Sequence, residues 1–501
     1  MVEVQIIDAV LPIIALVISA ILTIPAFKVI RKAKHQTALT LGWFIAVFTA
    51  AGLAVTNLVI TYYSTSPPPV VNLSLTNSAL SVFSSALMID AISIYMTVII
   101  IALSAVITLY TVLFVNSSAR PSERYFAIML LLTASLMGAV LSGDLLTLFI
   151  FWEAAAAGAG FMMLYKKSAL TLNSTLKYLV MIIIASAFVV FGLSLVYGIT
   201  GSLNFVAVQQ ALMTLSDKTL LVIAFIFIAT GYAIESAIVP FHFWLPDAYT
   251  AAPSTSAAFL SALVDQGSYY ILIRVLVFII TPTGALNWTF MLAIMAALTM
   301  IVGNLFALIQ DNVKRLIANI CVADVGYNLV AITSFTSLGI IGNMYFFLIG
   351  GITTALAFMV VGIINRHGFH TLEDFSGLGW KMPMVCLALV MAGMSFAGVP
   401  PFGGFLAKYL VFTAAIEANL SWLAVIGVLT SVLQTAYIFR LVNYMYAKKP
   451  KDETKIKEPK RLLVPIFMLV AAIIVLGLYP DIVFHLVDPV VDQLPFITLT
   501  L

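Results

Sequence analysis

Residues 231–274 read GYAIESAIVPFHFWLPDAYTAAPSTSAAFLSALVDQGSYYILIR, and they are the most informative part of the chain. An apolar helix carrying the carboxylate of Glu235 is interrupted at Pro240 and resumes after Pro253, and the next helix carries Asp265. An ionisable side chain in hydrocarbon costs a few kcal/mol or more. A helix break at membrane depth is tolerated only where protein or trapped water satisfies the freed backbone groups. The stretch therefore predicts a buried polar site inside a membrane.

The composition indicates a polytopic helical membrane protein. The 501 residues are 62% hydrophobic and 9% charged, with a mean hydropathy of +1.12, whereas a soluble domain carries about 25% charged residues. Cys321 and Cys386 both lie in apolar stretches and offer neither a disulfide framework nor metal-ligand spacing. The acidic start MVEVQIIDAV is unlike a secretory signal peptide. We therefore expect the first apolar segment to stay in the protein.

About fourteen segments are long enough to cross a membrane, since a crossing needs roughly 20 apolar residues. We predict them near residues 9–27, 39–62, 89–115, 124–142, 144–165, 175–197, 219–240, 254–280, 289–309, 313–334, 340–364, 383–417 (interrupted), 421–446 and 462–480. After residue 480 we expect no long amphipathic helix.

The positive residues predict the orientation, because cytoplasmic loops are enriched in lysine and arginine. With the N-terminus outside, 20 of the 24 lysine and arginine residues fall in inner loops, and only Lys218 falls in an outer loop. We expect a multi-pass protein of the plasma (inner) membrane with both termini on the outer side. The outer segment 63–88 is predicted to form a short hairpin or loop cap, and residues 448–459 a polar inner connector.

Two of the predicted spans are interrupted by proline, five spans apart. The seventh is broken at Pro240 and Pro246, and the twelfth, SFAGVPPFGGFLAKY (395–409), at Pro400 and Pro401. Paired interruptions in the two halves of a chain indicate an inverted-repeat transporter site. We predict an all-α polytopic membrane protein with two inverted five-helix repeats. Its parts are helices 1–3 in 1–115, the first repeat (helices 4–8) in 124–280, the second (helices 9–13) in 289–446, and the inner loop with helix 14 in 447–501.

Few ionisable residues fall inside the predicted helices. Glu153, Glu235 and Lys408 lie about mid-span, and a buried charge needs a partner or a proton, so we favour a functional role for these three. For the residues near helix ends we favour side chains that reach the membrane interface: Asp90, Asp144, Arg274, Glu417 and Arg440. Of these, Asp144 and Arg274 are kept as accessory candidates for the site.

The break in the seventh span adds candidates for gating. His242 follows the break, and a role in gating or proton uptake is as well supported as a helix-capping role. Pro240, Pro400 and Pro401 are the corresponding gating positions in the two broken helices. No catalytic triad, metal site, phosphate-binding loop or nucleic-acid patch is evident in the sequence, and no cofactor is expected.

Four segments together resemble one known family. GDLLTLFIFWE, PFHFWLPDAYTAAPSTSAAFLSALV, GNLFALIQDNVKRLIA and AGVPPFGGFLAKY are similar, in order and spacing, to the antiporter-like family. This family includes the D-type subunit of Mrp cation/proton antiporters, the large antiporter-like subunits of respiratory complex I, and counterparts in membrane-bound hydrogenase- and sulfane-sulfur-reductase-type complexes. The resemblance covers roughly residues 85–445.

The resemblance implies a file of protonatable side chains at mid-membrane. It places Glu153 at the helix-5 glutamate of the family and Lys408 at the helix-12 position. The family's helix-7 and helix-8 lysines fall on Glu235 and Asp265, and a histidine or neutral polar residue on Asp324. The second-half lysine falls on Thr354.

These departures make the relay rich in acids. Two facing carboxylates, Glu153 and Glu235, would share a proton instead of forming an ion pair. Such a file, with Asp265, Asp324 and Lys408, could pass H⁺ or could bind Na⁺ through oxygen ligands.

We expect an ion-translocating subunit of a redox-driven or Mrp-type complex. It would carry no redox centre of its own, and its partners would be other membrane subunits that are antiporter-like or belong to a quinone or hydrogenase module. One alternative is a non-conducting structural subunit of the membrane arm with a degenerate relay. A second alternative is a stand-alone secondary carrier, which would need a cavity the size of its substrate.

Overall fold

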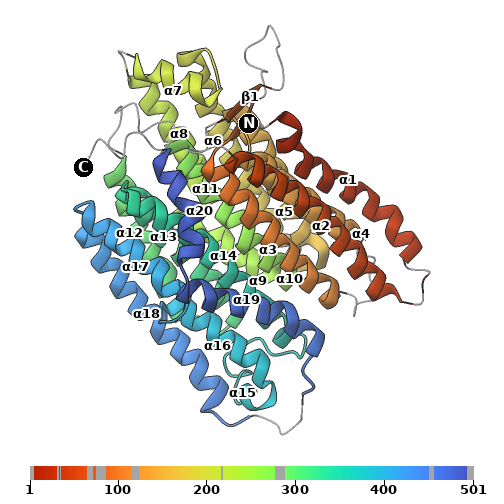
Figure 1. Ribbon diagram of the computed structural model, residues 1–501. Helices are drawn as coiled ribbons and strands as arrows, with labels where there is room; N and C mark the ends of the chain where they lie inside the picture. Colours follow the sequence, from red (N-terminus) through yellow and green to blue (C-terminus); the bar gives the residue numbers. More distant parts are fainter. Residues whose placement is uncertain are drawn as a thin grey trace.

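The computed structural model describes residues 5–30, 33, 35–64, 71–74, 86–115, 123–166, 168–215, 218–276, 288–450 and 456–493. Helices make up almost all of this part of the chain and pack side by side in one bundle (Figure 1). Eleven of them are long and apolar enough to cross a membrane. They are α1 (Ile6–Ile30), α2 (Gln36–Tyr63), α3 (Ala91–Val115), α4 (Glu123–Val140), α5 (Leu145–Met163), α6 (Ala169–Thr200), α12 (Thr289–Leu308), α13 (Val313–Ser334), α14 (Ser337–Asn365), α18 (Ser421–Tyr446) and α19 (Lys460–Leu478).

Three further spans are interrupted. The seventh consists of α8 (Thr219–Glu235) and α9 (Trp244–Ala251), joined through the short 3-10 helix η3 (Phe241–Phe243). The eighth runs through α10 (Ser254–Phe259), the π-helical turn η4 (Leu260–Val264) and α11 (Asp265–Val275). The twelfth consists of α16 (Pro383–Ala397) and α17 (Gly403–Glu417). Together with the eleven continuous helices, these confirm the fourteen predicted spans and the breaks in the seventh and twelfth.

The second half of the seventh span corrects one prediction. We expected the helix to stay interrupted from Pro240 to Pro253, with Pro246 as a second breaking residue, but Pro246 is the third residue of α9. A backbone N–H in the first turn of a helix has no partner within the helix, so proline is accepted there. The break is therefore short, and it contains the cis peptide bond Val239–Pro240 and Ala237 with φ 52°.

The break in the twelfth span depends on glycine. Gly398 ends α16 in the left-handed conformation with φ 73°, which suits a residue without a Cβ atom. A Cβ atom on Gly404, in the first turn of α17, would lie 1.8 Å from the carbonyl oxygen of Ser395. The two half-helices can therefore approach this closely only with glycine at position 404. The bond Pro400–Pro401 between them is cis.

Smaller elements lie at the ends of the bundle. Strands β1 (Val71–Ser74) and β2 (Ala86–Ile89) pair antiparallel, as the predicted outer hairpin requires, while residues 75–85 lie outside the described part. The other short elements are η2 (Leu164–Lys166), α7 (Phe205–Met213), α15 (Leu378–Lys381) and α20 (Asp481–Asp492). Of the predicted inner connector, residues 451–455 lie outside the described part.

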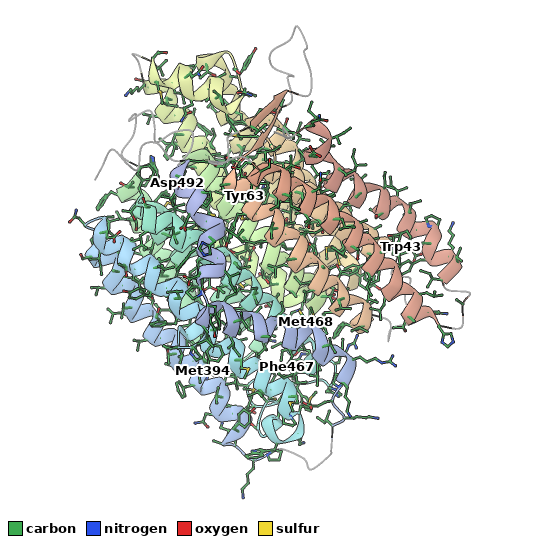
Figure 2. All side chains as sticks on the ribbon, in the orientation of Figure 1. Trp43, Tyr63, Met394, Phe467, Met468 and Asp492 are labelled. Atoms are coloured by element: carbon green, nitrogen blue, oxygen red, sulfur yellow. The ribbon has the colours of Figure 1, made fainter. Side chains whose placement is uncertain are left out.

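The centre of the bundle is formed by α13 and α14. In the most apolar 18-residue stretch of each helix, 100% and 94% of the residues are buried, respectively. By contrast, α1, α6 and α19 bury only 33% of theirs and form the outer surface. Figure 1 shows the same arrangement, with α1 and α2 on one flank, α17 and α18 on the other, and α13 and α14 between them. Figure 2 shows apolar side chains such as Phe467 and Met468 of α19 on this surface, as expected for contact with lipid.

Candidate functional site

The two acids of the first half lie close together. Glu153 is half-buried on α5, and its Oε1 accepts a hydrogen bond from the hydroxyl of Ser186 at 2.7 Å. Glu235 is the last residue of α8 and is 5% exposed, and its Oε2 accepts a hydrogen bond from the indole N–H of Trp152. The two carboxylates interact electrostatically. Trp152 and Glu153 are adjacent on α5, so one turn of this helix carries the first acid and donates a hydrogen bond to the second.

The second oxygen of Glu235 has a different environment. Its Oε1 is buried and receives no hydrogen bond from any residue that the structure describes, and the same holds for the hydroxyls of Tyr232 and Ser236 nearby in the chain. Buried polar atoms without partners are rare in native proteins, and they are commonly explained by water, an ion or a catalytic role. These unpartnered oxygens could hydrogen-bond a water molecule near Glu235, or Glu235 could carry a proton on Oε1.

Asp265 continues the file toward the centre of the molecule. It follows the π-helical turn η4, a feature that is frequent at functional sites. The hydroxyl of Tyr249 donates a hydrogen bond to its Oδ1. Tyr178 lies within electrostatic range of Glu153, Glu235 and Asp265, so its buried phenol connects the first two acids with the third.

The second half pairs an acid with a lysine. Asp324 on α13 and Lys408 on α17 are each 5% exposed and interact electrostatically. The Nζ of Lys408 donates to Gln434 Oε1 at 2.6 Å and to Ser431 Oγ at 3.2 Å, and it lies 4.4 Å from the centre of the Tyr327 ring. The Nε2 of Gln434 is buried and has no hydrogen-bond partner among the residues that the structure describes. Gln434 therefore holds the lysine through its carbonyl oxygen and keeps a free N–H donor beside the pair.

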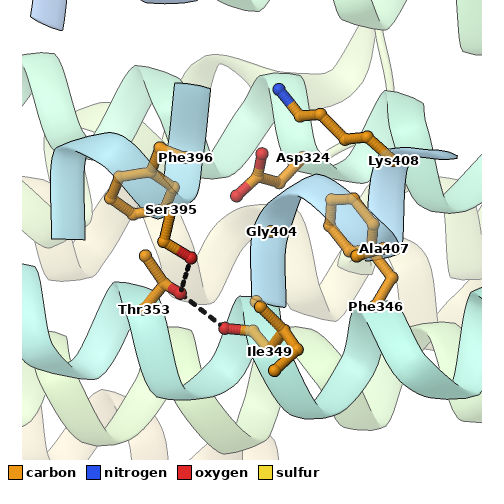
Figure 3. Close-up of a pocket in the computed structure, with 10 residues that line it drawn as sticks. Asp324, Phe346, Ile349, Thr353, Ser395, Phe396, Gly404, Ala407 and Lys408 are labelled. Carbon is orange, nitrogen blue, oxygen red and sulfur yellow. Dashed lines mark hydrogen bonds between the residues drawn. The ribbon is translucent and has the colours of Figure 1, made fainter. Parts of the chain in front are cut away.

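A small cavity lies beside this pair. Its volume is about 20 Å³, and Asp324, Lys408, Gly350 and Thr353 are among the residues that line it (Figure 3). Thr353 and Ser395 form a hydrogen bond of 3.0 Å in one wall. A cavity needs roughly 10–15 Å³ of such volume to hold one water molecule, and the water needs polar partners. The cavity thus has room for about one water beside the acid and the lysine, although most of its surface is apolar.

The five predicted relay residues fall into two electrostatic groups. Glu153 interacts with Glu235, and Asp324 interacts with both Asp265 and Lys408. Tyr178 lies within electrostatic range of both groups, and its hydroxyl donates a hydrogen bond to the carbonyl of Ala156. Sequence reasoning missed the neutral side chains that hold these charges, namely Trp152, Tyr178, Tyr249, Gln434 and Ser431. Their only signal was polarity within an apolar helix, which does not say what they contact.

The gating candidates lie at the breaks. His242 is 4% exposed in η3, where its ring contacts the Pro240 backbone and lies 5.9 Å from the centre of the Phe306 ring. Pro400 and Pro401 join α16 to α17, which carries Lys408. Thr354, where the family has a lysine, is buried and bonds through its hydroxyl to the Gly351 carbonyl at 3.2 Å.

Three candidates near helix ends are buried, so the expectation that they reach the interface is wrong for them. Arg274 is 0% exposed and forms a bidentate ion pair with Asp90, with further hydrogen bonds to the Tyr270 hydroxyl. Asp144 is 4% exposed and accepts hydrogen bonds from the backbone N–H of Thr147 and of Ala86. Asp144 therefore caps α5 and anchors β2. Both acids find partners within the protein, and these partners compensate the loss of hydration.

The remaining charged motif residues join helices on one side of the bundle. Asp247 of α9 pairs with Lys177 of α6 at 2.8 Å and with Arg315 of α13 at 3.0 Å. The neighbouring Lys314 donates to the carbonyl of Ala252. The motif DNVKR thus holds the first residues of α13 against the segment that follows α9.

A larger cavity lies at the helix ends near this motif. Its volume is about 450 Å³, and its lining includes Lys314, Arg366 and His370 but none of the five relay residues. This cavity is therefore much larger than the one beside Asp324 and Lys408, and the charged side chains that line it are basic.

Comparison with known proteins identifies relatives of the chain. The family described as NADH:quinone oxidoreductase/Mrp antiporter, TM, matches residues 142–434. The chain is 31% identical over 416 residues to the F(420)H(2) dehydrogenase subunit N of Methanosarcina mazei, covering 80% of this chain and 83% of that protein. It is 31% identical over 409 residues to the NADH-quinone oxidoreductase subunit N of Thioalkalivibrio sulfidiphilus, covering 81% and 85% of the two chains.

Solved structures agree with these relatives. A chain of the membrane-bound sulfane sulfur reductase, an archaeal respiratory membrane complex, superimposes with a TM-score of 0.87 at 27% identity and 97% coverage of both chains. A chain of the Mrp complex from Dietzia has a TM-score of 0.84 at 23% identity and 98% coverage of both, which shows the shared fold. The chain therefore belongs to the NADH:quinone oxidoreductase/Mrp antiporter transmembrane family and is an antiporter-like membrane subunit, as its four motifs predict.

Proposed function

We propose that this subunit translocates protons along Glu153, Glu235, Asp265, Asp324 and Lys408, driven by a redox reaction in partner subunits. The observation that carries the proposal is that these charges, buried or half-buried on five different spans, form two electrostatic groups with Tyr178 within range of both. A charge displaced at one end of such a file changes the electrostatic energy of its neighbour, because Coulomb interactions are strong where water is scarce.

The proton is preferred over Na⁺ because of the size of the mid-membrane cavity. About 20 Å³ beside Asp324 and Lys408 suits one water, which can relay a proton between two side chains. A hard cation needs several oxygen ligands around it. Of the residues that line this cavity, only Asp324 is a carboxylate, and Lys408 is a cation that would repel Na⁺.

The breaks in the seventh and twelfth spans supply the moving parts of the proposal. Pro240 and His242 follow Glu235 by five and seven residues in the chain, and Pro400 and Pro401 precede the half-helix that carries Lys408. A shift of either half-helix would change the distance from its charged residue to the next one. We propose His242 as a gating or proton-uptake residue.

The setting proposed is a multi-subunit complex in the plasma (inner) membrane, with both termini on the outer side. The relatives named above are subunits of respiratory complexes, and this supports antiporter-like and quinone- or hydrogenase-module partners. The stand-alone carrier is disfavoured because the cavity at the charged file is water-sized, while the cavity of about 450 Å³ contains none of the relay residues. The non-conducting subunit is the alternative that experiment must separate.

The test is ion flux in vesicles that contain the assembled complex. Glu235→Gln and Lys408→Ala should each lower proton translocation by about tenfold or more, which corresponds to an added barrier of about 1.4 kcal/mol. Asp311→Asn is the matched control, since this acid is 77% exposed in its surface pair with Arg440. Pumping that survives both relay changes would establish the structural alternative. A Na⁺ dependence that disappears in Glu235→Gln would replace H⁺ by Na⁺ in the proposal.

A further inference from the structure

One buried polar side chain between the two halves is not used by the relay described above. Gln266 follows Asp265 on α11 and is 4% exposed. Its Oε1 receives no hydrogen bond from any residue in the described part of the chain. A side-chain amide offers two N–H donors and an acceptor oxygen, and buried amides are normally satisfied. Gln266 is therefore suited to bind a small polar molecule.

Gln266 faces α14 at a pair of glycines. A Cβ atom built on Gly350 would lie 3.6 Å from Gln266 Nε2, and one built on Gly351 would lie 3.5 Å from Gln266 Cγ. Gly350 also lines the cavity of about 20 Å³ beside Asp324 and Lys408. Gly350 therefore lies between the amide of Gln266, which it faces at contact distance, and the cavity that it lines.

The two glycines have different reasons to be glycine. At Gly351 a Cβ atom would lie 2.8 Å from the carbonyl oxygen of Ala262, so the close packing of η4 on α14 excludes a side chain there. At Gly350 the nearest atoms would be 3.5 Å away on Phe346 and 3.6 Å away on Gln266, which are ordinary contacts. Alanine would fit at 350 and is favoured over glycine within a helix. Packing does not require glycine at 350, and its absence of a side chain keeps space open beside Gln266.

We infer that Gln266 is a positioning residue that holds a water molecule between Asp265 and Asp324, across the bare surface of α14 at Gly350. The inference rests on the proposed proton relay and assigns the step between its two halves. A proton leaving Asp265 joins this water, and the water passes a different proton to Asp324. Only the two carboxylates change charge, because the amide of Gln266 accepts and donates hydrogen bonds without titrating.

The experiment compares three variants of the assembled complex in vesicles. Gly350→Ala places a methyl group in the space beside Gln266, and Gln266→Met keeps the side-chain length but removes the amide. Each should lower the rate of proton translocation by about tenfold, equivalent to about 1.4 kcal/mol in the barrier. Gly158→Ala on α5 is the matched control, since its Cβ atom would meet only Leu132 at 3.4–3.6 Å, away from the file. It should translocate as the unaltered complex does.

Assembly and redox turnover are measured on the same samples, so that a folding defect is recognised. A solvent deuterium isotope effect on translocation that rises in Gly350→Ala would support a blocked water, whereas a purely structural role would leave it unchanged. If Lys408→Ala abolishes translocation while Gly350→Ala and Gln266→Met retain it, the inference about Gln266 is wrong and the relay stands. If Lys408→Ala also retains it, the proposed function fails and the inference fails with it.

Discussion

The two broken spans carry opposite charges at their breaks. Glu235 is the last residue of the half-helix before the break in the seventh span, and Lys408 lies in the half-helix after the break in the twelfth. Glu235 interacts with another acid, Glu153, whereas Lys408 interacts with Asp324. Like charges that share a site favour one shared proton, and an acid with a lysine forms an ion pair. The two halves therefore share an architecture but hold charge differently.

The eighth and thirteenth spans extend the comparison. Asp265 lies nine residues before Arg274, and Ser431 lies nine residues before Arg440. The first arginine is fully buried against Asp90, while the second reaches Asp311 with side-chain exposures of 32% and 77%. In the eighth span, Asp265 and Arg274 are both buried charges. At the corresponding positions of the thirteenth span, Ser431 is neutral and Arg440 forms an ion pair at the surface. In the second half, Gln434 and Ser431 hold the buried cation Lys408, and a second buried lysine, Lys314, donates to the carbonyl of Ala252.

The largest effect is expected from the two arginines. Arg274→Met leaves Asp90 buried without its partner, and breaking such a pair costs about 3–5 kcal/mol of unfolding free energy. Arg440→Met disrupts an exposed pair, for which a loss of about 1 kcal/mol or less is expected. Chemical unfolding of the detergent-solubilised protein measures both. Equal losses in the two variants would contradict the difference in burial between the halves.

A charge reversal in the second half should have the next largest effect. Lys408→Glu makes that half an acid pair like Glu153 and Glu235 and removes the cation from the file. We expect translocation to fall by about hundredfold, equivalent to about 2.7 kcal/mol in the barrier. Proton flux per redox turnover in vesicles is the measurement. Flux above half of the unaltered level would mean that an acid pair can replace the acid–lysine pair. The two halves would then not differ in the charges that they require.

The hydrogen bonds to the two central charges should differ more modestly. Trp152→Phe removes a donor to Glu235 and should cost about 1–2 kcal/mol of stability, because a buried acceptor loses its partner. Ser431→Ala removes one of two bonds made by Lys408 and should cost less, since Gln434 remains. Unfolding midpoints of the two variants, compared side by side, check this order. A greater loss in Ser431→Ala would show that Gln434 does not hold the lysine by itself.

The smallest effect is expected when the first half is made like the second. Glu235→Lys places a cation opposite Glu153, so repulsion is replaced by attraction, although the indole N–H of Trp152 loses its acceptor. We expect translocation to change by about threefold or less, which is about 0.65 kcal/mol. The same flux assay tests it, with Glu235→Gln as the reference that supplies no charge. If Glu235→Lys abolishes flux as completely as Glu235→Gln, a carboxylate is specifically required at this position.

The sequence predicted the spans better than the contacts between them. Fourteen spans and the two breaks follow from apolar length and from proline, and Glu153, Glu235 and Lys408 stand out because ionisable residues are rare in lipid. Asp265 and Asp324 joined the predicted relay through the family resemblance. The error over Pro246 arose because a proline in the first turn of a helix looks the same in the sequence as one that ends a helix. The expectation for Arg274 and Asp90 is wrong because a residue near a helix end can still be buried against another helix, as this ion pair is.

The neutral residues of the site could not be assigned from the sequence. Trp152 and Glu235 are separated by 83 positions, and Lys408 and Gln434 by 26, so no local pattern joins them. Tyrosine, tryptophan and glutamine are also common in membrane helices for other reasons. The gap at Gly350 is less visible still, because a glycine in an apolar helix does not reveal what lies opposite it.

About fourteen membrane crossings, with a few charges inside them, can be predicted from the order of the residues. Both follow from the free energy of moving each side chain from water to hydrocarbon, which depends on the residue and its neighbours in the chain. Which of the charges meet depends on how the helices pack. The packing of α13 and α14 at the centre brings Asp265, Asp324 and Lys408 from three separate spans into one file. Electrostatic and hydrogen-bonding energies depend on distances of a few ångströms, and these arise only when the helices pack.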